Sequence, residues 1–308
     1  MKTPPKGLGF WIAFPEQIGG PSAVVAALQR VGAEWVAPRI GQGGWRNHEW
    51  TADHQMACID AGLPVYGWIY SMPKLIAKEV DTFAASLASG ASGCIIDAEI
   101  QWGTTETRSG PVVGGVDPAT ARDLARMYVH AFRAGCGDAW LATAPWPWVK
   151  YHPVYPAAAF GTGGGVYCDA ALPQAYPPEI GVTYDLCRSR MVEHWGRTPI
   201  HPIGATYGRS DIQRLGGTQL PPRDVVVDDV LRHILEAPGE YTSLYSLEAM
   251  GPDVSTALHA RADRIRVDGP DTYRPPPDLA DPIGAFASEA AEQIAYLENL
   301  CGIGKRTE

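Results

Sequence analysis

The sequence predicts an α/β fold, a (β/α)8 TIM-like barrel with a C-terminal linker and helix. Short β-branched or aromatic runs alternate with amphipathic segments from the start of the chain, which is the pattern of repeated βα units around a parallel sheet. Eight such units can be counted. The chain has 308 residues, and a barrel of this kind occupies roughly 250 residues as a single domain.

The eight predicted strands are short runs bounded by turn residues. They are Leu8–Phe14, Glu34–Ile40, Pro64–Tyr70, Cys94–Glu99, Ala139–Ala144, Ala170–Tyr176, Ile200–Tyr207 and Tyr241–Ala249. Glycine-rich loops at 41–50, 103–117 and 161–169 follow strand ends. They are therefore expected on the carboxyl face of the barrel, where they would shape a cleft, with Gly161–Gly165 as a flexible lid.

The predicted helices follow the strands in turn. They are Ser22–Val31, Thr51–Ala61, Pro73–Ser89, Pro118–Ala134, a short irregular piece after Pro145, Thr183–Trp195, Arg223–Glu236 and Ser255–Arg266. The fourth has the clearest ends, because Asp117 is a good N-cap before a proline at the first helical position. Gly135 is expected to close it as a left-handed cap.

Three regions divide the chain. Residues 1–266 form the predicted barrel domain, and residues 267–282 are rich in proline and aspartate, as in an extended linker. Residues 283–308 form the tail, in which Ile283–Leu300 has apolar residues at helical spacing. This helix is predicted to pack back on the barrel or to contact a partner.

Composition excludes several functions. A net charge of −9 without a basic run argues against nucleic acid as a partner. The N-terminus lacks the apolar core of a signal peptide and no run is long enough to span a membrane, so synthesis in the cytosol is expected. Six scattered cysteines predict free thiols, and the eight histidines lack metal-ligand spacing. No nucleotide or phosphate motif is present, so no metal or cofactor is predicted.

The fourth predicted strand ends on two carboxylates, Asp97 and Glu99. Because strand side chains alternate between faces, both should point the same way, with β-carbons about 6.5 to 7 Å apart. The carboxyl end of a buried strand is where α/β enzymes keep their chemistry. Like charges this close push two titrations apart, so one acid can keep its proton while the other is ionised, as glycoside hydrolysis requires. The alternative is an ion pair with a barrel arginine such as Arg39.

A second acid-x-acid triplet, Glu79-Val80-Asp81, lies in a predicted amphipathic helix. Its carboxylates are expected on a solvated helix face. Asp97 and Glu99 thus remain the candidate catalytic pair.

Other strand ends supply candidate helpers. Glu248 ends the eighth strand, which neighbours the first in a closed barrel, and is a third candidate catalytic carboxylate. Its alternative role is a helix-capping or surface glutamate. Gln174 and Tyr176 end the sixth strand and offer an amide and a phenol to sugar hydroxyls or an N-acetyl group. Ordinary barrel packing is the alternative for these two.

Ten tryptophans is a high number for this length. Sugar rings present apolar faces that pack on flat aromatic side chains, so tryptophans near strand ends favour a carbohydrate ligand. The alternative is that about half of them plug the core beneath loops. The predicted substrate-binding residues are Trp11, Arg39, Trp68, Tyr70, Trp102, Gln174 and Tyr176.

The chain resembles the glycoside hydrolase family 25 lysozymes, secreted or phage-borne β/α-barrel enzymes that cut peptidoglycan. Residues 33–43, AEWVAPRIGQG, look like the family's second strand, and residues 61–70, AGLPVYGWIY, look like its third. The run Ile95-Ile-Asp-Ala-Glu99 matches the Asp-x-Glu pattern of its fourth strand. The resemblance implies that Glu99 is the general acid and that Asp97 assists the anomeric centre or the substrate's N-acetyl group.

The likeness is greatest in the first half of the chain and departs from the family at strand one. There the family has Gly-x-Asp, which supplies another active-site carboxylate, whereas Trp11 stands at that place in this chain. Glu16 or Glu248 could compensate. The resemblance implies a divergent relative that keeps the central acid pair.

The predicted function is hydrolysis of a polymeric, amino-sugar-containing glycan resembling peptidoglycan, with overall retention by analogy to the family. A missing secretion signal would suit a phage lysin released through a separate membrane pore or an enzyme carried in a virion. Two alternatives stay open. One is a carbohydrate-binding barrel that has lost turnover, and the other is a phage structural protein that docks through Ile283–Leu300.

Overall fold

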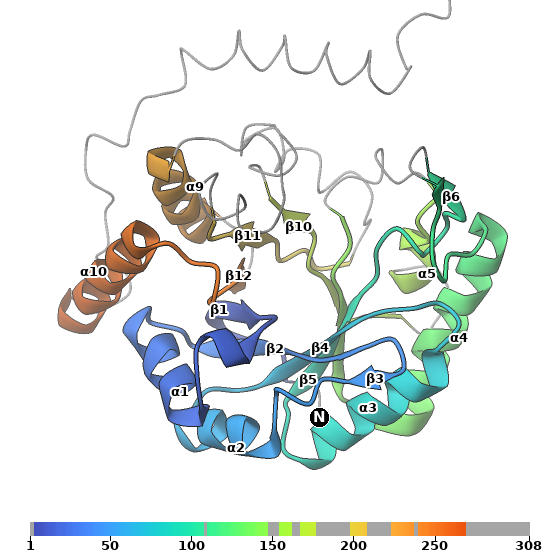
Figure 1. The fold of residues 1–308 in the computed structure, drawn as a ribbon, viewed down its shortest axis with the longest axis horizontal. Helices are drawn as coiled ribbons and strands as arrows, with labels where there is room; N and C mark the ends of the chain where they lie inside the picture. Colours follow the sequence, from blue (N-terminus) through green and yellow to red (C-terminus); the bar gives the residue numbers. More distant parts are fainter. Residues whose placement is uncertain are drawn as a thin grey trace, which may run out of the picture.

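The computed structural model describes residues 3–107, 110–146, 154–161, 167–176, 198–207, 223–236 and 240–268 (Figure 1). All eight predicted strands lie within these ranges, and each contains a strand in the structure. The predicted helix Thr183–Trp195, the glycine-rich segment Gly161–Gly165 beyond its first residue, and the C-terminal helix Ile283–Leu300 lie outside them. So does the predicted linker, except that the last described helix already includes residues 267 and 268.

Parallel strands form one continuous sheet in the order β10-β11-β12-β1-β2-β4-β5-β8-β9. Their short lengths and buried residues match the apolar runs that predicted them. The strands are β1 (Gly7–Ile12), β2 (Trp35–Gln42), β4 (Tyr66–Tyr70), β5 (Gly93–Asp97), β8 (Trp140–Thr143), β9 (Ala170–Ala171), β10 (Gln174–Ala175), β11 (Ile203–Ala205) and β12 (Tyr241–Tyr245).

The sheet closes into an eight-stranded barrel because β9 and β10 are two halves of one strand. On one side Leu172 N donates to Thr143 O, and on the other Ile203 N donates to the Pro173 carbonyl, at 2.7 and 2.9 Å. Pro173 has no N–H to donate, so the ladder is interrupted between the halves although the chain stays extended. The predicted (β/α)8 architecture is confirmed.

Aromatic side chains fill the amino-terminal part of the barrel interior. The rings of Trp140 and Tyr241 lie 6.1 Å apart, and Tyr241 also meets Trp35 at 6.2 Å. Tyr66 meets Trp140 edge-on at 5.3 Å. Because these four residues come from strands around the whole barrel, the interior is a packed core rather than a channel.

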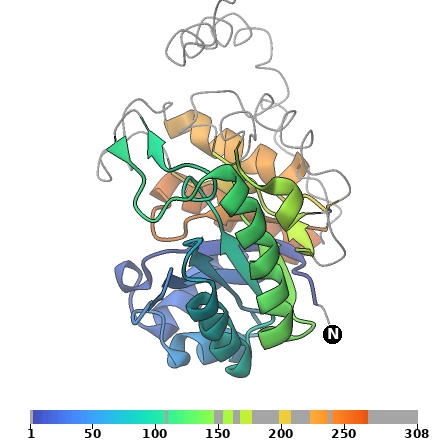
Figure 2. The ribbon, with the colours of Figure 1, turned by 90° about the vertical axis from the view of Figure 1, so that its right-hand side faces the viewer.

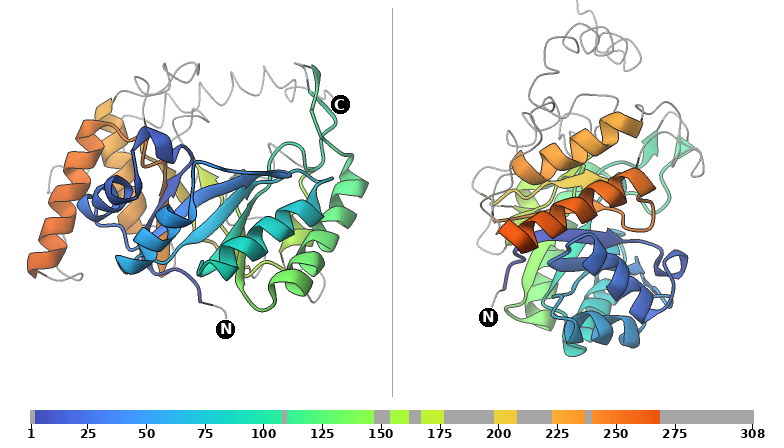
Figure 3. Two further views of the ribbon diagram at one scale, coloured as in Figure 1. Left: turned by 60° about the horizontal axis from the view of Figure 1, so that its bottom comes forward. Right: turned by 90° about the vertical axis from the view of Figure 1, so that its left-hand side faces the viewer.

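Helices cover the outside of the barrel, as Figures 1 and 3 show, and α9 and α10 lie side by side. Within the described residues no helix is both long and apolar enough to cross a membrane. The helices are α1 (Pro21–Arg30), α2 (Ala52–Asp60), α3 (Ile76–Ala88), α4 (Pro118–Cys136), α5 (Ala157–Phe160), α9 (Arg223–Glu236) and α10 (Pro252–Asp268).

Helix α4 confirms one predicted end and corrects the other. Asp117 caps its start, accepting hydrogen bonds from the backbone of Ala119 and Thr120 at 3.0 Å each. The helix does not end at Gly135, as predicted, but continues to Cys136. Gly137, with a φ of 61°, is the residue that ends it, and this backbone conformation favours glycine.

Short elements that the sequence did not predict lie in the loops after the strands. A turn of 3-10 helix, η1 (Pro15–Gln17), follows β1, and β3 (Trp45–Arg46) folds back on the end of β2. The strands β6 (Glu106–Thr107) and β7 (Gly110–Pro111) form a projecting hairpin between β5 and α4 (Figure 2). Two-residue strands give little periodic signal, which explains why they were missed.

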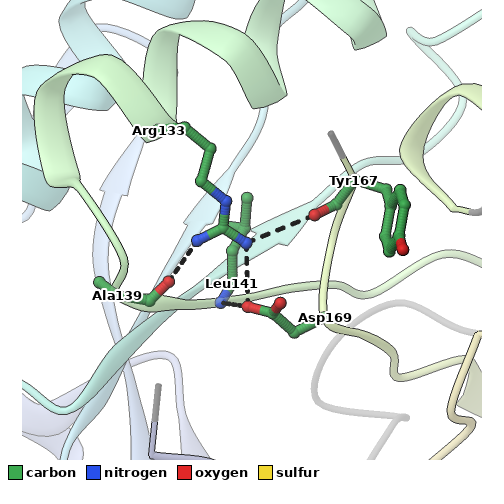
Figure 4. Close-up of polar contacts among 5 residues, drawn as sticks. All are labelled: Arg133, Ala139, Leu141, Tyr167 and Asp169. Carbon is green, nitrogen blue, oxygen red and sulfur yellow. Dashed lines mark hydrogen bonds and ion pairs between the residues drawn. The ribbon is translucent and has the colours of Figure 1, made fainter. Parts of the chain in front are cut away.

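An ion pair fixes the end of α4 to the amino-terminal edge of the barrel (Figure 4). Arg133 Nη2 lies 2.9 Å from Asp169 Oδ2, and the same oxygen accepts a hydrogen bond from Leu141 N at 2.9 Å. Arg133 also donates to the carbonyls of Ala139 and Tyr167. Strands β8 and β9 are thereby tied to the helix at the end opposite the acid pair.

Glu79 corrects a second prediction. The sequence places it on a solvated face of α3, but its side chain is fully buried. Its carboxylate accepts hydrogen bonds from Tyr128 Oη at 2.6 Å, Ser71 Oγ at 2.8 Å and Met72 N at 2.7 Å. Asp81, two residues on, is exposed as predicted.

Candidate active site

Asp97 and Glu99 meet at the carboxyl end of the barrel through a shared partner. Gln174 Nε2 donates to Asp97 Oδ1 at 2.8 Å and to Glu99 Oε1 at 3.1 Å. It also reaches the carbonyl of Ala144 at 3.3 Å. The two acids therefore point to the same side, as strand alternation predicted, and the amide of the sixth strand joins them.

Asp97 is the more enclosed acid of the pair. Burial raises its pKa well above the usual value, the negative charge of Glu99 raises it further, and the hydrogen bond from Gln174 opposes both effects. Glu99 is partly exposed. Because the two groups interact strongly, the protons belong to the pair, which can hold one proton at a pH where isolated carboxylates are ionised.

Tyr70 adds a phenol to the pair from the end of β4. Its hydroxyl accepts a hydrogen bond from Gln101 Nε2 at 2.7 Å and interacts with Glu99. Burial, followed by the charge of Glu99, raises the pKa of Tyr70 to about 12. The phenol therefore stays protonated at neutral pH and can donate a hydrogen bond. Two carboxylates, an amide and a phenol thus converge on one side of the barrel end.

No model of a protein family matches this chain, and no curated protein matches it in sequence. Solved structures match it at low identity. The β-glucuronidase 2 of Bacteroides uniformis has a TM-score of 0.55 and 8% identity, covering 84% of this chain and 35% of its own length. A glycoside hydrolase family 18 chitinase of Cycas revoluta, solved with (GlcNAc)4, has a TM-score of 0.55 and 11% identity, covering 83% and 98%.

A chitinase-like agglutinin from Robinia pseudoacacia has a TM-score of 0.52 and 10% identity, covering 82% of this chain and 98% of its own. The chain thus shares the barrel fold of these proteins. It spans about a third of the length of the β-glucuronidase and nearly all of the chitinase. At these identities the likeness concerns the fold alone.

Family 25 lysozymes are also among the matching structures. The lysozyme of Aspergillus fumigatus has a TM-score of 0.39 and 15% identity, covering 55% of this chain and 76% of its own. This match covers little more than half of the present chain.

The three tryptophans among the predicted site residues lie in different surroundings. Trp68 lies in the interior below the acids, and its Nε1 is buried without a hydrogen-bond partner in the described part of the chain. Trp11, at 5.4 Å from Trp68, donates its Nε1 to Ser243 and supports it. Trp102 is 0% exposed and packs outside the barrel against Phe160 and Tyr128. A buried ring cannot line a cleft, so the structure does not bring Trp102 to the acids.

Tyr176 belongs to an aromatic cluster at the same end of the barrel. Its ring stacks on Tyr245 at 5.7 Å and meets Tyr207 at 6.1 Å, while Tyr245 also meets Trp68 at 6.4 Å. The structure therefore brings Tyr176 and Trp68, two of the predicted substrate-binding residues, into one aromatic cluster. Tyr207 and Tyr245 were missed, although both fall in predicted strands at positions of the same parity as inward-facing residues.

Arg39 does not form the alternative ion pair with Asp97. Its guanidinium lies over the ring of Phe14, 4.6 Å from the centroid, and 5.9 Å from that of Trp68. Among the described residues the ion pairs join other partners, and no arginine contributes to the pKa of Asp97. The Arg39 guanidinium thus lies at the barrel end beside aromatic rings.

Glu248 lies across the barrel from the acid pair, because β12 and β5 are opposite in the strand order. Its Oε1 accepts hydrogen bonds from Ala13 N at 2.9 Å and Phe14 N at 3.2 Å, which tie the end of β1 to β12. Burial raises the pKa of Glu248. This geometry places Glu248 in a backbone clamp rather than beside Asp97 and Glu99.

Gln101 is a residue of the site that the sequence analysis missed. It holds Tyr70, and its own Oε1 is buried without a partner among the described residues. Gln101 lies in the turn after Glu99, in which Trp102 N donates to Glu99 O, so strand alternation does not determine its direction and the sequence carries no signal for it.

Proposed function

We propose that this protein is a glycoside hydrolase that cleaves a polymeric, amino-sugar-containing glycan, with Glu99 as the general acid and Asp97 as the assisting carboxylate. The observation that carries the proposal is the pair of acids bridged by Gln174 beside the phenol of Tyr70. The barrel fold, shared with several glycosidases, agrees with it. Peptidoglycan is the natural candidate glycan, and release as a phage lysin would suit the chain.

In the proposed mechanism the partly exposed Glu99 gives its proton to the glycosidic oxygen as the bond to C1 breaks. The carbonyl oxygen of the substrate's own N-acetyl group closes on C1. The single proton of the pair lies on Glu99 at this stage, because the N-acetyl N–H donates a hydrogen bond to Asp97 in addition to that from Gln174 and so stabilises its ionised form. The Asp97 carboxylate then stabilises the positive charge. Water then attacks C1 as the bond from C1 to the N-acetyl oxygen breaks, and it gives a proton to Glu99, which restores the acid.

The distance between the acids supports overall retention. Oxygens of both carboxylates lie within hydrogen-bond distance of one nitrogen, so these two oxygens are at most about 6 Å apart. Inverting enzymes keep their carboxyl groups about 6.5 to 9.5 Å apart to admit a water molecule. Retention by way of the N-acetyl group needs no such space.

Reducing-end release from peptidoglycan and from N-acetylglucosamine oligomers tests the proposal, with the anomer of the first product followed by NMR. We expect the β-product from β-linked substrates. Asp97→Asn should lower kcat by about 10²-fold, because the lost carboxylate stabilises charge only in the transition state. Undiminished turnover by Asp97→Asn, or release of the α-product, would contradict the assignment.

Gln174→Leu is predicted to move the pH dependence of activity. The amide stabilises ionised Asp97 and so lowers its pKa. Without it both macroscopic pKa values of the pair rise, and the whole bell-shaped profile of kcat shifts to higher pH. The profiles of wild type and Gln174→Leu, measured on one substrate, check this. An unchanged profile would mean that Gln174 does not act on the proton equilibrium of the acids.

A second candidate function is carbohydrate binding without turnover. Trp11 stands on strand one where the resembled lysozymes carry a carboxylate, and the fold is also that of a chitinase-like agglutinin. Binding of the wild type to insoluble chitin or peptidoglycan without any release of reducing ends would favour this function over hydrolysis.

A further inference from the structure

Trp45 is the most exposed tryptophan that the structure describes. Its side chain is 79% exposed, although an indole is among the largest apolar groups a protein carries. It lies on β3, the short strand that pairs with the end of β2 beyond the last residue of β1. An isolated apolar residue on a surface needs no explanation by itself. A role for Trp45 therefore has to follow from its position relative to the acids and from the rigidity of the turn that carries it.

The turn that carries Trp45 is held in place on both sides. Gly43 N donates to Tyr70 O at 2.8 Å, and Asn47 Nδ2 donates to Arg39 O at 2.8 Å. A β-carbon added to Gly43 would lie 2.9 Å from side-chain atoms of Leu75, and one added to Gly44 would lie 2.7 Å from Lys78. The turn therefore sits directly on the residues at the start of α3, and its glycines allow that approach.

The strand register places Trp45 on the side of the sheet that carries the acids. Gln42 is the partner of Tyr70 on β4 and of Trp45 on β3. Directly opposed residues on neighbouring strands point to the same face. Tyr70 contacts the site residues Gln101 and Glu99 on that face. Two strand spacings put the Cα of Trp45 about 10 Å from that of Tyr70.

From this arrangement we propose that Trp45 is a distal sugar-binding subsite, which stacks on a pyranose ring of the glycan a few units away from the bond that is cleaved. The inference rests on the proposed function and specifies it, because a subsite at this distance selects a polymer over a short oligosaccharide. An exposed indole face suits the apolar face of a sugar ring, and the fixed turn adds no ordering cost on binding.

Hydrolysis of substrates of two lengths tests the inference. Trp45→Ala should raise KM for an N-acetylglucosamine hexamer about five- to tenfold, with kcat within about twofold of wild type, as loss of one ring contact implies. The KM for a fluorogenic glycoside of the dimer should not change. Trp45→Phe, which keeps a flat ring, should retain most of the affinity. Met127→Ala, which removes an exposed apolar side chain on α4, is the matched control.

Equal KM values for wild type and Trp45→Ala on the hexamer would overturn the inference and leave the proposed function intact, and so would equal losses on both lengths. If the wild type cleaves neither substrate, the proposed function fails, and co-sedimentation with insoluble chitin decides the inference separately. Weaker sedimentation of Trp45→Ala than of Met127→Ala would then support the subsite. Equal sedimentation, or none by the wild type, would overturn it.

Discussion

Glu99→Gln is expected to reduce kcat on amino-sugar glycans by about 10³-fold, the usual contribution of a general acid to such a reaction. The amide has nearly the shape of the carboxyl group but cannot give a proton to the leaving oxygen. KM should change little, because the substrate contacts outside the acid are kept. Initial rates of reducing-end release measure the effect.

Two controls separate chemistry from folding in this experiment. Glu240→Gln makes the same change at the amino-terminal end of β12, an exposed position remote from the acids, and should leave kcat unchanged. Thermal unfolding of Glu99→Gln should match that of wild type. Substrates with a good leaving group need less acid assistance, so the variant should lose much less activity on an aryl glycoside than on an oligosaccharide. Equal losses on both would remove Glu99 from the role of acid.

The barrel could be predicted from the sequence because its signals are local. Each strand is an apolar run of limited length, and strand alternation alone places Asp97 and Glu99 on one side. Both acids lie at the carboxyl end of the barrel because they stand at the carboxyl end of strand β5. The contact of both acids with Gln174 also follows in outline, because inward-facing side chains of alternate barrel strands lie in one layer and only β8 separates β5 from the strand of Gln174. Each of these features depends only on the alternation of side chains along a strand and on the order of the strands in the barrel.

The side-chain directions of Trp102 and Glu248 could not be predicted from strand alternation. Both follow strand ends as expected, but the direction of a side chain beyond a strand depends on the loop that carries it. Trp102 turns outward onto Phe160, and Glu248 turns to the backbone of Ala13. Pro173 shows the opposite case, since a proline within a run argues against a central strand. Here the strand continues, because its remaining groups bond to neighbours on both sides.

Glu79 shows a third limit of the sequence, because helix periodicity cannot reveal a buried charge whose partners come from other elements. Glu79 lies next to Val80 at the border between the apolar and the polar face of α3, so helical periodicity is compatible with either a buried or a solvated side chain. The hydroxyl of Tyr128 reaches it from α4, and Ser71 and Met72 reach it from the end of β4. Only the packing of α3 against α4 brings these groups together.

Glu79→Ala is therefore predicted to be strongly destabilising, by at least about 3 kcal/mol in the free energy of unfolding. The truncation leaves the buried hydroxyls of Tyr128 and Ser71 and the N–H of Met72 without their acceptor, and each unsatisfied buried group costs about 1 to 3 kcal/mol. Asp81→Ala on the same helix is the matched control and should stay within about 0.5 kcal/mol of wild type. Urea unfolding at pH 7 measures both. Similar values for the two variants would contradict the buried network.

The pH dependence of stability gives an independent test through Glu79→Gln, which keeps an acceptor but does not titrate. Burial raises the pKa of Glu79 in the folded chain above 4.5, although its hydrogen bonds oppose the shift. The folded state therefore holds this proton more tightly than the unfolded state does. Its contribution to stability is complete below pH 4.5 and is lost as the pH rises through the folded-state pKa. Relative to Glu79→Gln, the wild type should lose stability over that interval, and a constant difference between the two would show that Glu79 titrates alike in both states.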